Sequence, residues 1–158
     1  MSPLVCFPRT YGRWDVPSRG LPANLRGQRR RVGRLFAILA PLAPKGGATL
    51  VATGSHRIVQ TLVDGRGYEQ SSGEVRKRLK AKHRWFAGLM SSDRDRERAR
   101  RFMDVPTEVD GVPLQVEEMT GAPGDVFLMH PAALHAATPN VLEAPRLVLA
   151  QFVHPKTD

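Results

Sequence analysis

The chain has 158 residues, a mass of 17.5 kDa and 41% hydrophobic residues, which suits a single domain with a buried core. Its longest apolar run, residues 35–42, is too short to span a bilayer, and its start shows no secretory signal. We therefore expect no membrane association. The single cysteine, Cys6, excludes an internal disulfide, which suits a reducing compartment, so we expect a cytoplasmic protein.

The net charge of +9 is concentrated in three basic clusters, at residues 26–34, 76–84 and 94–101. Such clusters can neutralise phosphates or an acidic substrate, but they are more often solvated surface. The third cluster, RDRERARR, alternates acids and bases, which favours charge pairs on a helix. Because no interleaved aromatic residues or helix-turn-helix pattern accompany the charge, nucleic-acid binding is the weakest of the functions considered.

Taken in chain order, the first 33 residues are rich in Pro, Gly and Arg and predict a loop with one short strand at residues 4–7. The apolar run RLFAILAPL, residues 34–42, is bounded by turn residues and predicts a buried strand. After the turn APKGG, the segment ATLVAT, residues 48–53, predicts a second strand.

The middle of the chain has helical patterning. Apolar side chains recur at helical spacing over residues 73–90, with basic residues between them. A second helix is expected to begin at Ser92 or Asp93, either of which is a good N-cap. It should end near Met103, because Pro106 cannot continue it.

The last third of the chain is again patterned as strands. Asp110-Gly111 predicts a tight hairpin turn between TEV and VPLQVEEM, and DVFLMH and RLVLAQFV predict two further strands. Strands, then helices, then strands with hairpin turns indicate an antiparallel β core. We therefore expect one mainly β domain over residues 1–158, with a helical insertion at about residues 73–103.

Three segments, in this order, resemble one known family. GGATLVATGSHR (residues 46–57), GAPGDVFLMHPAALHAATPN (121–140) and APRLVLAQFV (144–153) are similar to the phytanoyl-CoA dioxygenase family of iron(II)- and 2-oxoglutarate-dependent oxygenases. The shared pattern is a strand that ends in Gly-Ser-His, then Pro-Gly-Asp, then His-Pro-x-x-x-His-x-x-x-x-Asn, and an arginine on the next strand. The resemblance implies a double-stranded β-helix, the cupin-like jelly-roll, whose barrel mouth holds the site.

The resemblance also implies roles for individual residues. His135 matches the distal ligand of iron(II), and Arg146 matches the arginine that binds the far carboxylate of 2-oxoglutarate. Imidazole is a good iron ligand, and a planar guanidinium can hold a carboxylate with two hydrogen bonds, so both residue types suit these roles. His130, at a strand end, and His56, in the Gly-Ser-His loop, are expected to be structural.

The rest of the metal site departs from the family pattern. The family takes its first histidine and its carboxylate from a His-x-Asp motif ahead of the Gly-Gly strand, but no histidine precedes His56. The alignment through RWDVPSRGLPANLRG lays Pro22-Ala23-Asn24 over that motif, and Asp15 is the alternative carboxylate. A site with one imidazole should lose most of its affinity for iron, because affinity depends on the number and charge of the ligands.

The chain is also short ahead of this point, with about twenty residues where the family has a further helical and strand region. One interpretation is a jelly-roll trimmed at its N-terminal side. Another is an exposed sheet edge that a second copy of the chain covers in a homo-oligomer. An internal start site or a gene fragment would explain the same shortness.

Two functions stay open. The chain is either an oxygenase that uses iron(II) and 2-oxoglutarate to hydroxylate a small organic substrate, or a catalytically inactive relative. The inactive relative would bind a small carboxylate through Arg146 or serve as a structural or partner subunit. An acidic substrate would suit the basic side chains of the insertion, although a helix with solvated charges explains them equally: Arg76, Lys80, His83 and Arg84.

Overall fold

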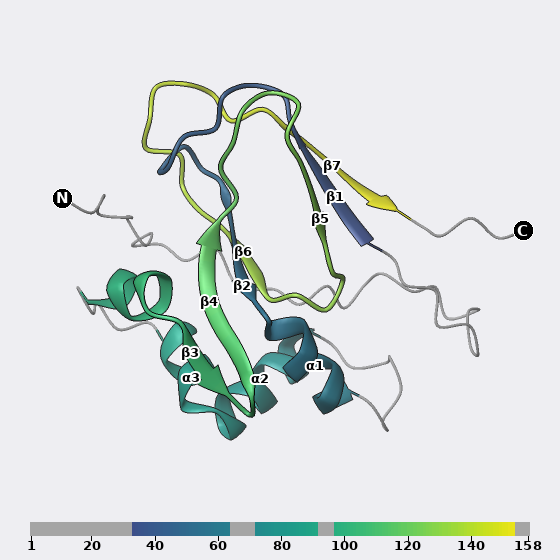
Figure 1. The fold of residues 1–158 in the computed structure, drawn as a ribbon, viewed down its shortest axis with the longest axis vertical. Helices are drawn as coiled ribbons and strands as arrows, with labels where there is room; N and C mark the ends of the chain where they lie inside the picture. The colour runs from purple at the N-terminus through teal and green to yellow at the C-terminus, as the bar shows by residue number, and fades with distance from the viewer. Residues whose placement is uncertain (1–32, 64–71, 92–96, 154–158) are drawn as a thin grey trace, which may run out of the picture.

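The structure, a computed structural model, describes residues 33–63, 72–91 and 97–153 (Figure 1). Its strands are β1 (Gly33–Ile38), β2 (Thr49–Thr53), β3 (Thr107–Val109), β4 (Val112–Glu118), β5 (Val126–Met129), β6 (His135–Ala137) and β7 (Val148–Val153). They form two antiparallel sheets, a smaller one in the order β5-β1-β7 and a larger one in the order β3-β4-β2-β6. The prediction of a mainly β chain with antiparallel strands is confirmed.

The helical part of the molecule lies between β2 and β3 in the sequence and covers one face of the larger sheet (Figure 1). It consists of α1 (Ser55–Val63), α2 (Ser72–Lys82), α3 (Arg84–Leu89) and the π-helical turn η2 (Arg100–Asp104). Buried side chains of these helices pack with those of β2 and β4 in one cluster. The helical members of that cluster are Ile58, Val59, Val75, Leu79, Trp85, Phe86, Leu89 and Phe102.

The smaller sheet packs against the opposite face of the larger sheet. A second core lies between the sheets and contains Phe36 of β1 and Met129 of β5, with Val51 of β2 packed against it. On β2, the neighbours of Val51 point the other way, since Leu50 and Ala52 belong to the helical cluster. A strand covered on both faces is apolar at successive positions, which explains the continuous apolar run in ATLVAT.

The first two predicted strands are present as β1 and β2, but they lie in different sheets. The turn at residues 43–47 carries the chain from the smaller sheet to the larger one. Two isolated bridges, Leu42 to Gly121 and Gly46 to Asn140, tie this turn to the loops that follow β4 and β6. The strand predicted at residues 4–7 lies outside the described residues.

Within the insertion predicted at about residues 73–103, the described residues are mainly helical, with internal boundaries other than those expected. Helix α2 stops at Lys82 because His83 is extended (φ −131°, ψ 122°), and α3 begins after it. The start predicted for the second helix, Ser92 or Asp93, lies outside the described residues, and η2 occupies its end.

Helix α1 replaces the loop expected at Gly-Ser-His. Its buried residues Ile58 and Val59 lie on the face toward the larger sheet, and Leu62, one turn on, packs against the same cluster. The stretch IVQTL thus has helical spacing, but it is too short for that spacing to stand out in the sequence.

The predicted hairpin turn is confirmed. Val109 of β3 lies opposite Val112 of β4, and the two residues between them, Asp110 (φ 50°) and Gly111 (φ 72°), both have positive φ. This is the conformation of a type I′ turn, which matches the right-handed twist of the strands.

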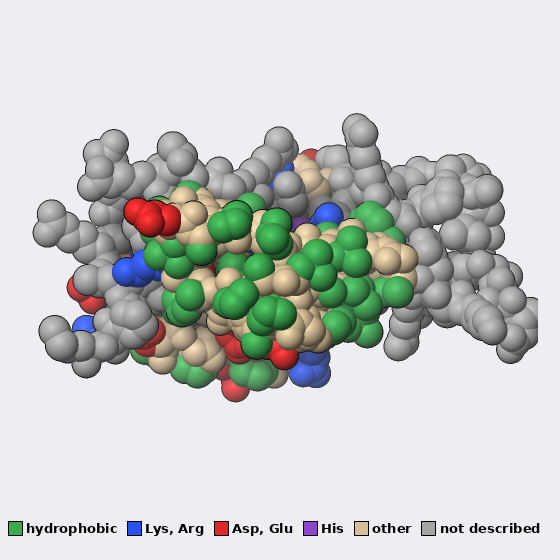
Figure 2. All heavy atoms as spheres, turned by 90° about the horizontal axis from the view of Figure 1, so that it is seen from above, with side chains coloured by type: hydrophobic (Ala, Val, Ile, Leu, Met, Phe, Trp, Pro, Cys, Tyr) green, Lys and Arg blue, Asp and Glu red, His purple; other side chains and the backbone are tan. Residues whose placement is uncertain are grey.

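Two surfaces of the described part are apolar. On the outer face of the smaller sheet, Val126, Leu128 and Leu149 are 56%, 71% and 50% exposed. Hydrophobic side chains also gather at the loop end of the sandwich (Figure 2), where Val141 and Leu142 are exposed. Within residues 33–63, 72–91 and 97–153, no helix is long and apolar enough to cross a membrane.

Candidate functional site

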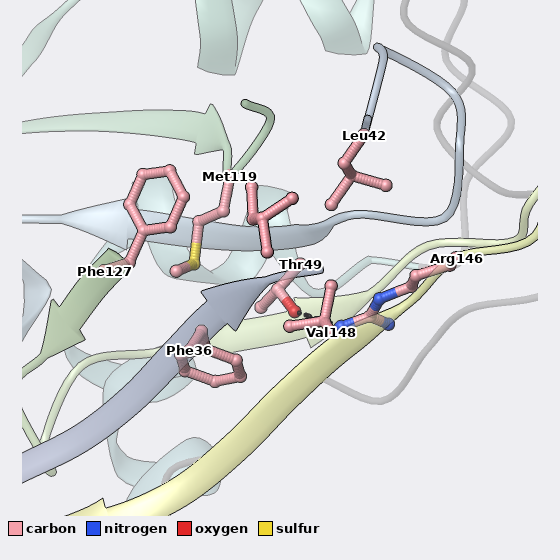
Figure 3. A pocket seen from close by; sticks show the side chains of 8 residues that line it. Phe36, Leu42, Thr49, Met119, Phe127, Arg146 and Val148 are labelled. Carbon is pink, nitrogen blue, oxygen red and sulfur yellow. Dashed lines mark hydrogen bonds between the residues drawn. The ribbon is translucent and has the colours of Figure 1, made fainter. Parts of the chain in front are cut away.

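Arg146 lies just ahead of β7 and reaches across the sandwich to the larger sheet (Figure 3). Its Nη2 donates a hydrogen bond to Oγ1 of Thr49 on β2, with a distance of 3.1 Å. Thr49 is only 6% exposed, so the bond joins the entry of β7 to the buried interior. Burial lowers the pKa of Arg146, but a guanidinium stays charged at neutral pH.

The pocket beside Arg146 is small and mainly apolar. Its volume is about 10 Å³, which is room for about one water molecule. Arg146 and Thr49 are its polar residues, and the rest of its lining comes from both sheets and the loops: Phe36, Ile38, Leu42, Met119, Phe127 and Val148 (Figure 3). The pocket itself is therefore too small for a ligand larger than about one water molecule.

His135 is the first residue of β6 and lies opposite Val51, so its side chain shares the inner face of the larger sheet. Its Nε2 is 3.3 Å from Nη1 of Arg34, and its Nδ1 is 3.2 Å from the carbonyl oxygen of Ala133. A guanidinium can only donate, so Nε2 accepts from Arg34. The ring proton therefore sits on Nδ1 and points to Ala133.

Arg34 is the site residue that the sequence analysis did not single out. It lies on β1, and its guanidinium carbon is 5.5 Å from the ring centre of Phe36 and 5.2 Å from that of Phe152 on β7. Cation–π contacts of this kind attract the guanidinium to both rings. The sequence carries a signal for it, because Arg34 has the same strand parity as the buried Phe36.

The described residues do not fit an iron(II) site. Non-haem iron is bound by two histidines and a carboxylate, and no group of three His, Cys, Asp or Glu residues lies together within the described ranges. The lone pair on Nε2 of His135 already accepts from Arg34, whose positive charge would repel a metal cation at that atom. Asp15 and the Pro22-Ala23-Asn24 stretch lie outside the described residues, so Asp15 as a metal ligand stays a prediction.

The histidines assigned structural roles lie next to each other. Nδ1 of His130 accepts from the backbone N–H of Ala132 at 3.0 Å, and the ring of His130 lies against that of His56, with 4.8 Å between their centres. Burial, and secondly the charge of Arg57, lower the pKa of His56. The adjacent Ser55 connects these segments, because its hydroxyl donates to the carbonyl oxygen of Ala52 and accepts from the backbone N–H of Leu134.

The basic side chains of the insertion do not meet Arg146. Helices α2 and α3 pack on the face of the larger sheet that points away from Arg146 and His135. Lys80 and Arg84 are exposed there, whereas His83 is buried and lies 3.8 Å from Asp110. Lys80 and Arg84 therefore contribute to the surface of the helical layer, and neither they nor His83 line the pocket.

We found no match to this chain among protein-family models, curated proteins or solved structures. The site is therefore defined by its own geometry. Two arginines, Arg34 and Arg146, each bridge the sheets through a polar side chain, and the chemistry they offer is the binding of anions.

Proposed function

We propose that the chain is a jelly-roll protein of the phytanoyl-CoA dioxygenase type that binds a small carboxylate through Arg146 and does not hydroxylate it. The competing function, an iron(II)- and 2-oxoglutarate-dependent oxygenase, needs ligands that the described residues do not supply. Both functions place a carboxylate on the same arginine. They differ in whether binding and turnover of that carboxylate require iron(II).

The order of the strands supports the jelly-roll. Strand β2 pairs with β4, and β1 pairs with β5, so the chain is folded as nested antiparallel pairs. From β4 onward, successive strands alternate between the sheets, with β5 in the smaller, β6 in the larger and β7 in the smaller. Nested pairs that alternate between two packed sheets are the pattern of a jelly-roll.

The observation that carries the carboxylate assignment is the environment of Arg146. Its guanidinium is partly buried and bonds Thr49, and within the described residues it has no carboxylate partner. A guanidinium has five N–H donors, and buried charges are normally paired. A ligand carboxylate would take two of these donors in parallel and supply the missing negative charge.

The experiment is isothermal titration of the full chain with glutarate, in EDTA and then with added iron(II). We expect binding in EDTA that iron does not strengthen. Arg146→Gln should weaken it about ten- to hundredfold, the usual loss for a charged hydrogen-bonded pair. Arg100→Gln is the matched control, because Arg100 is an exposed arginine on η2 that pairs with Glu97 at 3.6 Å and does not line the pocket beside Arg146.

Two results would overturn the proposal. If glutarate does not bind, or binds Arg146→Gln as well as the wild type, Arg146 is not a carboxylate site. If the protein converts 2-oxoglutarate to succinate with iron(II) and oxygen above the level of His135→Ala, it is an oxygenase and the inactive assignment is wrong.

A further inference from the structure

Strand β7 ends the smaller sheet and is the longest edge strand of the described fold. It has six residues, whereas the other edge strands, β3, β5 and β6, have three, four and three. Its sequence, VLAQFV, contains no charge and no proline, and Val and Phe favour an extended backbone. Proteins commonly protect a sheet edge with short strands, charges or proline, because its unpaired N–H and C=O groups can bind another strand. Strand β7 has none of these three features.

The hydrogen bonds of the smaller sheet show which groups of β7 point to its open side. The N–H of Leu39, just after β1, donates to the carbonyl oxygen of Leu147, just before β7, whereas the residue before Leu39 donates on the β5 side. This direction alternates along an antiparallel strand, so the odd-numbered residues of β7 bond β1. The N–H and C=O groups of the even-numbered residues point away from β1: Val148, Ala150 and Phe152.

The second half of β7 is accessible at its edge and on both faces. Residues 149–152 are all exposed, and Figure 1 shows β7 at the margin of the fold with β1 beside it. Ala150 lies opposite the buried Phe36, so Ala150 and Phe152 are on the inner face of the sheet, yet Phe152 is 43% exposed. The larger sheet therefore does not cover this half of β7, and a further strand has room beside it.

We propose that two copies of the chain pair through β7 and form a dimer with one continuous sheet of six strands, three from each copy. The two-fold axis passes at Ala150, so Ala150 lies opposite its own counterpart and Val148 lies opposite Phe152 of the second copy. Each opposite pair exchanges two hydrogen bonds, so this register uses every group of β7 that points away from β1. Every other antiparallel register leaves some of these groups without a partner in β7.

The side chains of β7 suit this pairing on both faces. On the inner face, Val148 of one copy contacts Phe152 of the other, and such β-branched and aromatic pairs stabilise sheets. On the outer face, Leu149 lies opposite Gln151, and no like charges meet because β7 has none. Each copy contributes one strand, so the interface is small and we expect a dissociation constant on the order of 10 µM. The inference goes beyond the proposed binding of a carboxylate and does not depend on it.

The first test is sedimentation velocity of the full chain from about 1 to 500 µM, where the wild type should pass from monomer to dimer. Ala150→Pro should raise the dissociation constant more than about tenfold, because it removes an N–H that bonds the second copy and none that bonds β1. Leu128→Pro is the matched control. The N–H of Leu128 points away from β1 at the opposite edge of the same sheet, so this variant should dimerise as the wild type does.

Cross-linking tests the register without proline. In a Cys6→Ser background, the dimer places the Cα atoms of two Ala150→Cys chains about 5.5 Å apart, within the range of a disulfide. Two Gln151→Cys chains are diagonal neighbours with Cα atoms about 7–8 Å apart, beyond that range. Mild oxidation should therefore link Ala150→Cys chains and leave Gln151→Cys chains unlinked.

Three results would overturn the proposal. A wild type that stays monomeric at about 500 µM would mean that β7 does not recruit a second copy. A dimer that Ala150→Pro leaves intact, or that Leu128→Pro weakens as much, would place the interface elsewhere. Equal cross-linking at positions 150 and 151 would rule out the two-fold axis at Ala150, and this comparison decides the matter if circular dichroism shows that Ala150→Pro does not fold.

Discussion

Ser55 joins three parts of the chain through one hydroxyl group. It is fully buried at the start of α1, donates to the carbonyl oxygen of Ala52 in β2 at 2.6 Å, and accepts from the backbone N–H of Leu134 at 2.9 Å. The second bond fixes the residue immediately before His135. Ser55 therefore sets the position at which β6 enters the larger sheet.

Ser55→Ala should destabilise the protein by about 1–3 kcal/mol, because the buried N–H of Leu134 loses its acceptor. The change is measured as the shift of the urea unfolding midpoint at constant m-value. Thr61→Ala is the control: its hydroxyl bonds Arg57 within the exposed part of the same helix, and its loss should cost less than about 0.5 kcal/mol. Equal costs for the two variants would contradict the role of Ser55.

His56 gives the protein a pH dependence of known sign. Its pKa in the folded state lies below the ordinary value of 6.5, chiefly because of burial and secondly because of the charge of Arg57. Below pH 6.5 the unfolded chain therefore binds more protons at this residue than the folded chain does. The free energy of unfolding falls as the pH is lowered from about 6.5.

His56→Gln should flatten this part of the pH profile. We expect the loss of stability between pH 7.5 and pH 5 to be smaller in the variant than in the wild type, as measured by urea unfolding at each pH. Above pH 7.5 the two profiles should run parallel, because neutral His56 no longer exchanges protons there.

The sequence alone indicated Arg146 and His135 as candidate site residues, but it did not indicate Arg34. The first two lie in segments with a recognisable order and spacing, whereas Arg34 stands at the edge of a basic cluster that suggests solvated surface. Its significance depends on Phe152, more than 100 residues later, which the register places opposite it. Contacts across such a distance follow from sheet pairing and have no local signal.

Two glycines at the ends of elements have similar backbone angles but different surroundings. Gly111 (φ 72°), in the β3–β4 turn, has open space where a Cβ would be. Gly54 (φ 76°), between β2 and α1, would place a Cβ against the carbonyl oxygen of Pro113 in β4. The absence of a side chain at Gly54 lets α1 begin close to the larger sheet.

Gly111→Ala should cost about 1–2 kcal/mol, which is the penalty of a left-handed backbone for an L-residue. Gly54→Ala should cost that amount and about 1–3 kcal/mol more, because backbone atoms must move to accept the methyl group. Thermal or urea unfolding of both variants gives the comparison. A Gly54→Ala variant as stable as Gly111→Ala would mean that α1 can shift away from β4 without cost.

At the level of elements, the sequence predicted the hairpin and the described strands except β6 (His135–Ala137), and it predicted the helical boundaries less well. Asp110-Gly111 determines its turn locally, through the positive φ of two residues. The break at His83 has no comparable cause in its neighbours: the side chain is buried beside Phe86, and tertiary packing overrides a continuous helical pattern. Which strands share a sheet is likewise decided by the packing of distant segments.

At the scale of the molecule, side chains on the two faces of the smaller sheet should contribute unequally to the free energy of unfolding. Phe36 on its inner face is 5% exposed in the core between the sheets, whereas Leu128 on its outer face is 71% exposed. Such an apolar outer face is either an interaction surface or a liability for aggregation. Leu128 tests whether a second copy of the chain covers this outer face, which is a different surface from the sheet edge considered in the sequence.

Phe36→Ala should destabilise the monomer by about 3–5 kcal/mol, the usual cost of emptying a core position. Leu128→Ala should change stability by less than about 0.5 kcal/mol if its side chain faces solvent. Urea unfolding at two protein concentrations separates the cases. A cost above about 1 kcal/mol for Leu128→Ala at both concentrations would mean that the chain itself covers the outer face. A cost that appears only at the higher concentration would mean that a second copy covers it, because association stabilises the folded state by mass action.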